Sequence, residues 1–394
     1  MKPETEMTPK ELFDYRIRLF RDALAWKKPD RTPFSGNVFN WMFQDAGYTT
    51  AYAVRHYDAA EDSLVKFYKK YNIDHFNTGV TAFRNYNAVT DLLGEGDDGY
   101  TGNDENLINC IVEDLISPDE YDYFIEDMTK ATWERFLGRR YKRMQNMSPR
   151  EFAESVKEHY HYRQERARIE ERLRTEFGIV VEKQTAMSWS SLENVFGGLR
   201  GVRGMSLALR RHYDKLQAFV KANDAGTVDW AISCMKDFDG WNMNEPYDCM
   251  ISMLPHNIMC PKQFEELIWP VFKPVLEYAV EHDKQIINFC EGSWKSIGKY
   301  FNDFPKGTIC MMVETDDPFE LRKLYPNVAI YGGLDTSVLG AGTPQQCVDM
   351  AKKAIDELGW DGGLILAPNK MLSYPKDVKP ENFEAVSRFV HEYK

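Results

Sequence analysis

Short apolar runs recur along the chain, and this feature restricts the fold more than any other. About eight runs are rich in β-branched, aromatic and other apolar residues, and a closed (β/α)8 barrel needs eight strands. The expected strands are 35–40, 73–77, 179–189, 248–254, 285–290, 308–314, 328–334 and 363–368. The last four are continuous apolar runs separated by helical patterns, which is typical of parallel strands buried on both faces. We therefore expect an α/β fold in which right-handed βαβ units form a TIM barrel.

Five segments carry a helix-start signature, in which a capping residue precedes proline and Glu or Gln follows two residues later. The signatures begin at Thr8, Ser117, Ser148, Cys260 and Thr343. The hydroxyl accepts from amides of the first turn, and proline at the first helical position has no amide to leave unpaired. The cysteine version is the weakest of the five. The signature at Thr8 places an N-terminal helix ahead of the first strand.

Residues 78–178 interrupt the alternation of strands and helices. They are dominated by charge-rich helical sequence, such as the basic run at 139–143. We interpret this stretch as a largely helical insertion over the barrel mouth, within one barrel domain that spans 1–394. The segment 97–104 is similar to a calcium loop, but its spacing fails the EF-hand pattern, so a plain loop is the simpler interpretation.

Charge and cysteine content exclude several classes of protein. A net charge of −12 without a long basic run argues against a nucleic-acid partner, because affinity for phosphate backbones needs clustered Lys and Arg. The seven cysteines form no CxxC pair and no disulfide framework, which fits a reducing cytoplasm. Charges interrupt every apolar stretch of the N-terminal segment, so it is neither a signal peptide nor a membrane span. We expect a soluble, cytoplasmic protein.

Motifs at both ends of the chain carry a family resemblance. They are the segments 28–33, 287–292, 331–335 with 339–344, 362–368 and 379–383, which read KPDRTP, INFCEG, YGGLD with LGAGTP, GGLILAP and KPENF. Together they resemble the uroporphyrinogen decarboxylase superfamily, which includes decarboxylases and corrinoid-dependent methyltransferases. The resemblance implies a TIM barrel with an active site in the barrel mouth.

The chain departs from two patterns of that superfamily. True uroporphyrinogen decarboxylases carry two substrate-binding arginines in a segment that is similar to 41–48 here, and both arginines are missing. A substrate with many carboxylates would lose its guanidinium clamps, so we expect a closer relation to the methyltransferases. Methyltransferases that activate a thiol hold zinc with His-x-Cys and a later Cys. Here the pair reads Asn288-Phe289-Cys290 and the later position falls on Lys370, so one of the three ligands remains.

Catalytic side chains of such a barrel project from the C-terminal ends of the strands. The expected catalytic residues are Glu291, Glu314, His256 and Lys370, and the expected substrate-binding residues are Trp41, Asn77, Trp189, Asn257, Asn288, Asn369 and Asp335. Cys290 is a candidate zinc ligand, together with His256 or Glu314. Several of these residues also have a purely structural interpretation: Cys290 as a buried hydrophobe, Glu291 and Asp335 as helix caps, and His256 as a loop residue bonded to backbone.

These residues lead to three hypotheses about function. The first is a methyltransferase that moves a methyl group from a small O-methyl donor, with aromatic methyl ethers among the candidates, to a Co(I) corrinoid. A separate corrinoid-binding protein would carry that cofactor, because the chain lacks an Asp-x-His-x-x-Gly motif. Glu291, Glu314 or His256 would stabilise the departing alkoxide or phenolate. The second is a decarboxylase or lyase with a less anionic substrate, and the third is a non-catalytic partner of a corrinoid protein. A homodimer is the alternative to a single chain.

Overall fold

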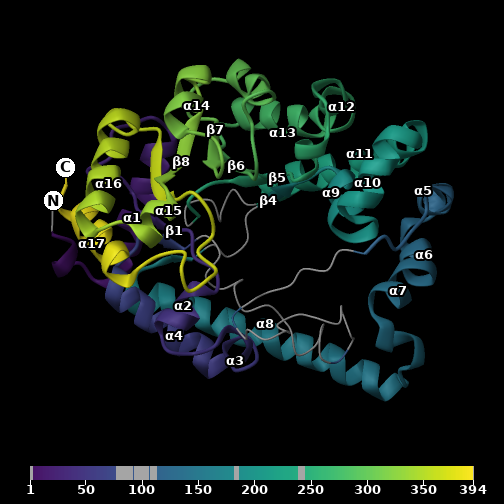
Figure 1. Ribbon diagram of the computed structural model, residues 1–394, viewed down its shortest axis with the longest axis horizontal. Coiled ribbons are helices and arrows are strands. Elements are labelled where there is room, and N and C mark those ends of the chain that lie inside the picture. Colours follow the sequence, from purple (N-terminus) through teal and green to yellow (C-terminus); the bar gives the residue numbers. More distant parts are fainter. Residues whose placement is uncertain are drawn as a thin grey trace.

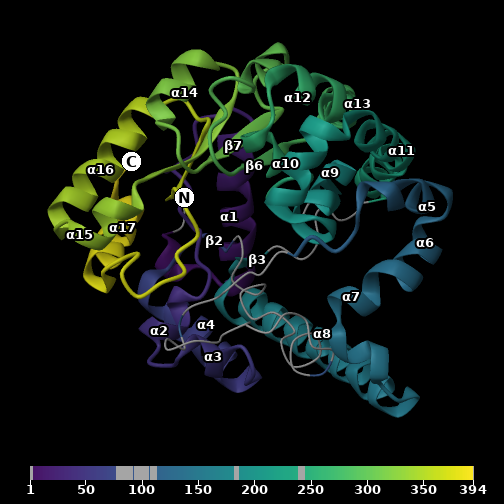
Figure 2. The ribbon, with the colours of Figure 1, turned by 45° about the vertical axis from the view of Figure 1, so that its right-hand side comes forward.

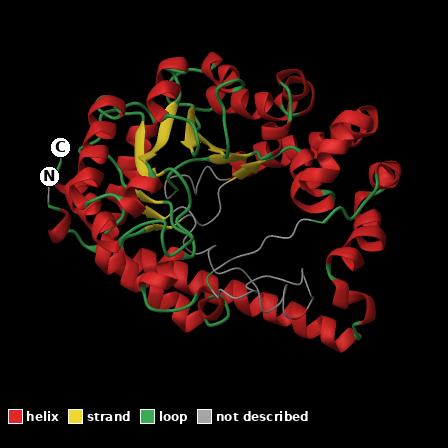
Figure 3. Cartoon of the chain, viewed as in Figure 1, coloured by secondary structure: helices red, strands yellow, loops and turns green. Residues whose placement is uncertain are grey.

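Two parallel sheets form the centre of the computed structural model, which describes residues 3–76, 92, 106, 113–181, 186–237 and 245–393. The three-stranded sheet contains β1 (Ser35–Gly36), β2 (His75–Phe76) and β3 (Val180–Val181). The six-stranded sheet contains β4 (Ala186–Ser188), β5 (Cys249–Ser252), β6 (Ile286–Cys290), β7 (Ile309–Val313), β8 (Ala329–Leu334) and β9 (Leu364–Pro368). Helices surround both sheets (Figures 1 and 3). The predicted α/β fold with parallel strands is confirmed.

The two sheets meet beside β1 and β9. Phe34 pairs with Leu366 and Val38 pairs with Leu372, both in parallel orientation. The strands therefore follow one another in the order β3, β2, β1, β9, β8, β7, β6, β5 and β4. At the far end of this order, β3 and β4 are consecutive in the chain, and residues 182–185 between them lie outside the described residues. The expected strand 179–189 is thus two described strands in different sheets, and closure into a TIM barrel stays a prediction.

All five predicted helix starts are observed, because helices begin at Pro9, Pro118, Pro149, Pro261 and Pro344. The helices of the first half are η1 (Glu4–Glu6), α1 (Pro9–Leu24), α2 (Trp41–Asp45), α3 (Thr50–Ala53), α4 (Tyr57–Tyr71), η3 (Pro118–Glu120), α5 (Tyr121–Glu126), α6 (Met128–Ala131), η4 (Thr132–Leu137), α7 (Gly138–Arg140), η5 (Lys142–Asn146) and α8 (Pro149–Phe177). The later helices are α9 (Ser191–Asn194), η6 (Val195–Leu199), α10 (Gly201–Arg211), α11 (Tyr213–Asp237), η9 (Pro255–Ile258), α12 (Pro261–Leu267), α13 (Trp269–Glu281), η10 (Gly298–Asp303), α14 (Pro318–Leu324), α15 (Thr336–Ala341), α16 (Pro344–Leu358) and α17 (Pro380–Glu392).

Side chains of the six-stranded sheet divide between two apolar clusters. One face, called the inner face below, carries Ile287, Cys310, Met312, Ala329, Tyr331 and Ile365, which cluster with Phe20, Ala23 and Leu24 of α1. The opposite, outer face carries Ile286, Ile309, Met311, Ile330 and Leu364, which belong to the larger cluster shared with the surrounding helices. Figure 2 shows α1 near the centre of the molecule, beside the strands. Both faces are therefore apolar, as expected for strands covered on both sides.

A buried ion-pair network fastens the N-terminal segment to β2. Arg31 binds Asp74 through two hydrogen bonds of 2.6 Å, and it also bonds Glu4 at 2.7 Å. Arg16 lies 3.3 Å from the same Asp74 carboxylate. Burial alone would raise the pKa of Asp74, but the Arg31 charge and hydrogen bonds hold it below its ordinary value. The charges of this network are thus matched within the protein.

Residues 118–177 fold into short helices followed by the long helix α8. The C-terminal part of α8 buries Ile169 and Leu173, and the helix contacts α1, α4 and β3. Its N-terminal part extends away from the sheets in Figure 1. The other segment of the expected insertion, 78–112, lies outside the described residues apart from Leu92 and Asn106. In the parts of the chain that the structure describes, no helix combines the length and apolarity that a bilayer span requires.

Candidate functional site

A cavity lies at the C-terminal ends of the strands. Its described lining residues are Asn37, Phe289, Cys290, Glu291, Met312, Val313, Glu314, Tyr331, Pro368, Asn369, Lys370 and Met371. They come from β6, β7, β8, β9 and the segments that follow β1, β6, β7 and β9. The empty space between these residues is about 330 Å³, a value that includes open solvent at its mouth. Five expected site residues border this cavity: Cys290, Glu291, Glu314, Asn369 and Lys370.

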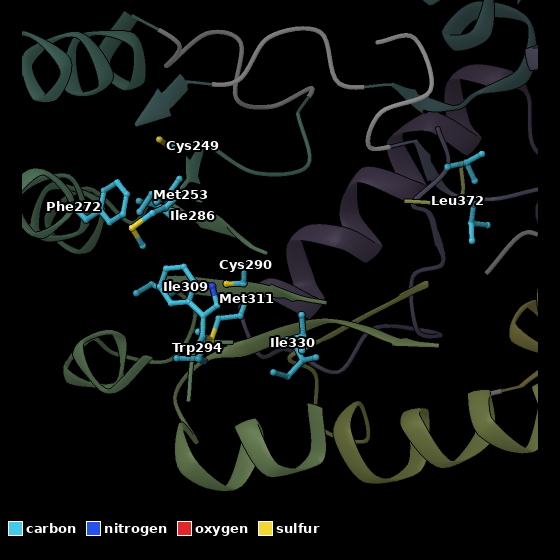
Figure 4. Packing of buried hydrophobic residues seen from close by; sticks show 14 of the residues in the cluster. Cys249, Met253, Phe272, Ile286, Cys290, Trp294, Ile309, Met311, Ile330 and Leu372 are labelled. Atoms are coloured by element: carbon cyan, nitrogen blue, oxygen red, sulfur yellow. The ribbon is translucent and has the colours of Figure 1, made fainter. Parts of the chain in front are cut away.

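Successive side chains at the end of β6 point to opposite faces, as in any strand. Ile287 and Phe289 pack with the inner cluster, whereas Ile286 and Cys290 pack with the outer one. Figure 4 shows Cys290 beside Met311 and Trp294, away from the inner face. Although Cys290 borders the cavity, its side chain therefore belongs mainly to the layer between the sheet and the helices.

Asn288 and Cys290 bond to one another on this outer side. The Asn288 amide donates to Cys290 Sγ at 2.9 Å, and the thiol donates to the Asn288 carbonyl at 3.3 Å. Burial raises the pKa of the Cys290 thiol well above its ordinary value. A protonated, buried thiol is a small hydrophobe rather than a nucleophile. Both side chains are thus buried in the layer between the sheet and the helices, and of the two only Cys290 is among the described lining residues of the cavity.

Glu291 and Glu314 form a carboxyl pair at the cavity. Gly292 donates its amide to Glu314 Oε2 at 2.9 Å, so the turn after β6 holds one oxygen of the second carboxylate. Burial, followed by the nearby charge of Glu314, raises the pKa of Glu291 to about 7. At neutral pH a substantial share of Glu291 is therefore a neutral acid that can donate a proton. Such a shift at a cavity is typical of general acids.

Glu193 is a carboxyl group that sequence reasoning missed. It lies in α9, after β4, and its Oε1 accepts from the amide of Leu254 at 2.5 Å. Burial raises the pKa of Glu193 to about 8, and the charge of Glu291 adds to this rise. The rule used for site prediction considered only residues next to strand ends, whereas Glu193 follows the expected strand 179–189 by four residues. An acidic residue on the short helix that follows the expected strand was the available signal.

His256 and Asn257 lie in η9, and Asn257 contacts the turn that carries Glu291. The His256 ring is buried and packs against Trp294 with ring centroids 4.6 Å apart. Burial lowers the pKa of His256 to about 4, so the ring is neutral at physiological pH and cannot act as a cationic acid. Asn257 donates to the carbonyls of Leu254 and Glu291, both at 3.3 Å. Neither residue borders the cavity, and Asn257 positions the backbone instead of binding a substrate.

Lys370, Asn369 and Asp335 have intramolecular partners. The Lys370 ammonium pairs with Asp377 at 3.0 Å, although its side chain is 44% exposed. Asn369 donates to the carbonyl of Glu314 at 3.0 Å and accepts from the amide and hydroxyl of Thr336, so it ties the ends of β7, β8 and β9 together. Asp335 accepts from the Ser337 amide at 2.8 Å and caps α15 outside the cavity.

Three expected aromatic or amide residues do not join this group. Trp41 is buried in α2, where it packs on Phe67 and Tyr71 within the core. Trp189 packs edge-on against Trp230 at 5.4 Å, away from the described lining. Asn77 lies outside the described residues.

Tyr331 and Asn37 are lining residues that sequence reasoning did not nominate. Tyr331 is a buried residue of the inner face, and its hydroxyl lies 2.5 Å from Ser35 Oγ. Asn37 follows β1 and is equally buried. Both residues lie in segments that were expected to be strands. The sequence of such a segment does not show which of its polar side chains faces a cavity.

The described residues do not offer a zinc site around Cys290. The one group of three or more acidic, His or Cys ligand atoms within 4.8 Å of each other, among described residues, is Glu4, Asp74 and His391. That group is part of the ion-pair network with Arg31, which already balances the carboxylates. Around Cys290, the thiol is buried and protonated and the His256 ring faces Trp294. We therefore assign no reaction step to zinc.

The family model of uroporphyrinogen decarboxylase (URO-D) matches residues 250–393, which extend from β5 through α17. This match supports membership of the uroporphyrinogen decarboxylase superfamily. The matched part contains all the described lining residues of the cavity except Asn37. No curated protein matches the chain.

Proposed function

We propose that this protein is an enzyme that moves a methyl group from a small O-methyl donor to the Co(I) corrinoid of a separate protein. Glu291 is the observation that supports the proposal most directly. A methyl ether releases an alkoxide or phenolate, which is a poor leaving group unless it receives a proton. Glu291 borders the cavity, is half-buried, and has a pKa raised to about 7, so it can give that proton at physiological pH.

The methyl acceptor in this proposal lies outside the chain. Cys290 is the only cysteine among the described lining residues, and its thiol is buried, protonated and turned to the outer face. It is not suited to accept a methyl group. A reduced corrinoid, presented by a partner protein at the cavity, would supply the nucleophile. The residues of this chain bind the donor, orient its methyl group and deliver the proton to the departing oxygen.

The charges of the cavity favour this reaction over decarboxylation of an acid. Glu291 and Glu314 would repel a substrate carboxylate, and the described lining contains no arginine. Its one lysine, Lys370, is already paired with Asp377. A carboxylate bound here would therefore lack the charged partner that usually holds it.

The test is methyl transfer from methoxybenzene derivatives to free cob(I)alamin, used as a substitute acceptor for the unidentified partner protein. Absorbance follows the loss of Co(I), and chromatography follows the phenol. We expect phenol and methylcobalamin in equal amounts, and Glu291→Gln should lower the rate by about 10²-fold or more. Glu281→Gln, on the exposed end of α13, is the matched control. Release of carbon dioxide from an added carboxylic acid without any corrinoid would instead favour the decarboxylase.

A further inference from the structure

The cavity presents hydrogen-bond acceptors that the protein itself leaves unsatisfied. Asn37 borders the cavity and is 4% exposed. Its amide donates to the carbonyl of Pro368 at 3.2 Å, which fixes Oδ1 as the acceptor, and no described residue donates a hydrogen bond to this oxygen. Buried acceptors without a partner are uncommon in proteins, because their desolvation is costly. A ligand that donates a hydrogen bond would satisfy this one.

Glu314 adds a second acceptor next to the same space. Its Oε2 accepts from the Gly292 amide, and no described residue donates to its Oε1. The backbone carbonyl of Glu314 is held by Asn369, so the residue is fixed while half of its carboxylate stays available. A positioned carboxylate of this kind binds an N–H or O–H group more strongly than a neutral acceptor does.

The positive charge that would balance these carboxyl groups is missing from the described lining. Lys370 is the only cationic residue there, and Asp377 already neutralises it. Asp377 itself also accepts from the amides of Ser373 and Tyr374, so this arrangement is well anchored. The buried network around Arg31 shows that the fold can supply guanidinium partners to carboxylates elsewhere. The described lining of the cavity contains no such guanidinium group.

The remaining walls suit a flat cation better than an anion. Phe289 and Tyr331 present aromatic surface, and Met312 and Met371 present polarisable sulfur. Aromatic faces attract ammonium groups, and thioethers pack well against rings. The lining therefore combines acceptors, aromatic surface and an excess of negative charge.

We propose that the cavity takes a methyl donor that carries an ammonium group, with Glu314 and Asn37 as the acceptors that hold it. The identity of the donor as a methoxy compound rests on the proposed function, whereas the preference for a cation rests only on the lining.

The experiment measures binding of three matched probes to the whole protein by calorimetry or ligand-observed NMR, without corrinoid. The probes are 4-methoxybenzylamine, 4-methoxybenzyl alcohol and 4-methoxybenzoate, which share ring and methoxy group but are cationic, neutral and anionic. We expect the amine to bind about tenfold or more tightly than the benzoate, with the alcohol between them, and added salt to weaken the amine most. Glu314→Gln should remove most of the difference.

Each contrary result overturns the proposal. It fails if the benzoate binds as well as the amine, if the amine shows no binding in the millimolar range, or if the amine keeps its advantage in Glu314→Gln. Circular dichroism checks that each variant folds, and the salt dependence of the unaltered protein tests the charge preference if Glu314→Gln does not fold. Because no corrinoid is present, failed methyl transfer with intact amine selectivity would overturn only the proposed function.

Discussion

Glu291→Gln should stabilise the protein at high pH and leave its stability nearly unchanged at low pH. The pKa of Glu291 is raised to about 7 by burial and by the Glu314 charge, whereas in the unfolded chain it has its ordinary value of 4.5. Below pH 4.5 the group is protonated in both states and the shift has no effect. As pH rises, the unfolded chain ionises first, so the folded state loses stability until pH reaches about 7. Glutamine does not ionise and escapes this loss.

The size of the effect follows from the shift. A rise from 4.5 to about 7 corresponds to about 3 kcal/mol at pH 8. Because the side chain is only half-buried, solvent screening reduces this value, and we expect about 1 to 2 kcal/mol. For a chain of 394 residues, that amounts to a rise in melting temperature of about 2 °C at pH 8.

Urea denaturation of Glu291→Gln, the unaltered protein and the exposed control Glu281→Gln at pH 5 and pH 8 measures this difference. The expected pattern is a gain for Glu291→Gln at pH 8 that is much smaller at pH 5, with no pH-dependent gain for the control. An equal effect at both pH values, or a loss at pH 8, would mean that the site does not oppose ionisation of Glu291. The assignment of this residue as the proton donor would then lose its physical basis.

Three further substitutions test the surroundings of the site and the fold. Glu314→Gln removes the charge that helps to raise the pKa of Glu291, so the pH range in which Glu291 ionises should move downward in the same two-pH denaturation series. Asp74→Asn leaves two buried arginines without their carboxylate and should cost about 3 to 5 kcal/mol in urea denaturation; a loss below 1 kcal/mol would contradict this. Gly292→Ala should lower both stability and methyl transfer, because φ at Gly292 is +71° and a Cβ would lie 2.0 Å from Asn257 Oδ1. Asn257→Ala in the same chain should recover part of that stability, measured as a double-mutant cycle.

Much of the strand and helix layout was predictable because it depends on local patterns. Capping chemistry acts within four residues, and all five predicted starts coincide with helices. The four C-terminal strands match their apolar runs to within one or two residues. The expected strand 179–189 shows the limit of this reasoning. An apolar run does not reveal its neighbours, and here one half pairs with β2 while the other pairs with β5.

The candidate site was only partly predictable because the strands that carry it are apolar on both faces. In β6 the run Ile286–Cys290 contains no alternation between polar and apolar residues that would mark the inner face. Asn288, Cys290 and Glu291 were therefore all expected at the site, although Asn288 and Cys290 share one face of the strand and the next side chain points to the other. Packing of Ile287 against α1 determines which side chains of β6 point to the inner face. Because α1 and β6 are far apart in the chain, this packing could not be predicted from local sequence. Glu291 meets the cavity, Cys290 borders it with a side chain that packs on the outer face, and Asn288 is not among the described lining residues.

The same contrast separates carboxylates that stabilise the fold from those that serve a site. Asp74 is fully buried, yet its pKa is held low because Arg16 and Arg31 lie beside it. Its negative charge therefore stabilises the folded state. Among the described residues, no cationic side chain pairs with Glu193 or Glu291, and burial raises both pKa values, to about 8 and about 7. Stability alone gives no reason to keep such groups, because neutral residues of similar shape would avoid the cost of their ionisation. A requirement for an exchangeable proton at the cavity does give one for Glu291, which borders it, and the charge of Glu291 acts in turn on Glu193.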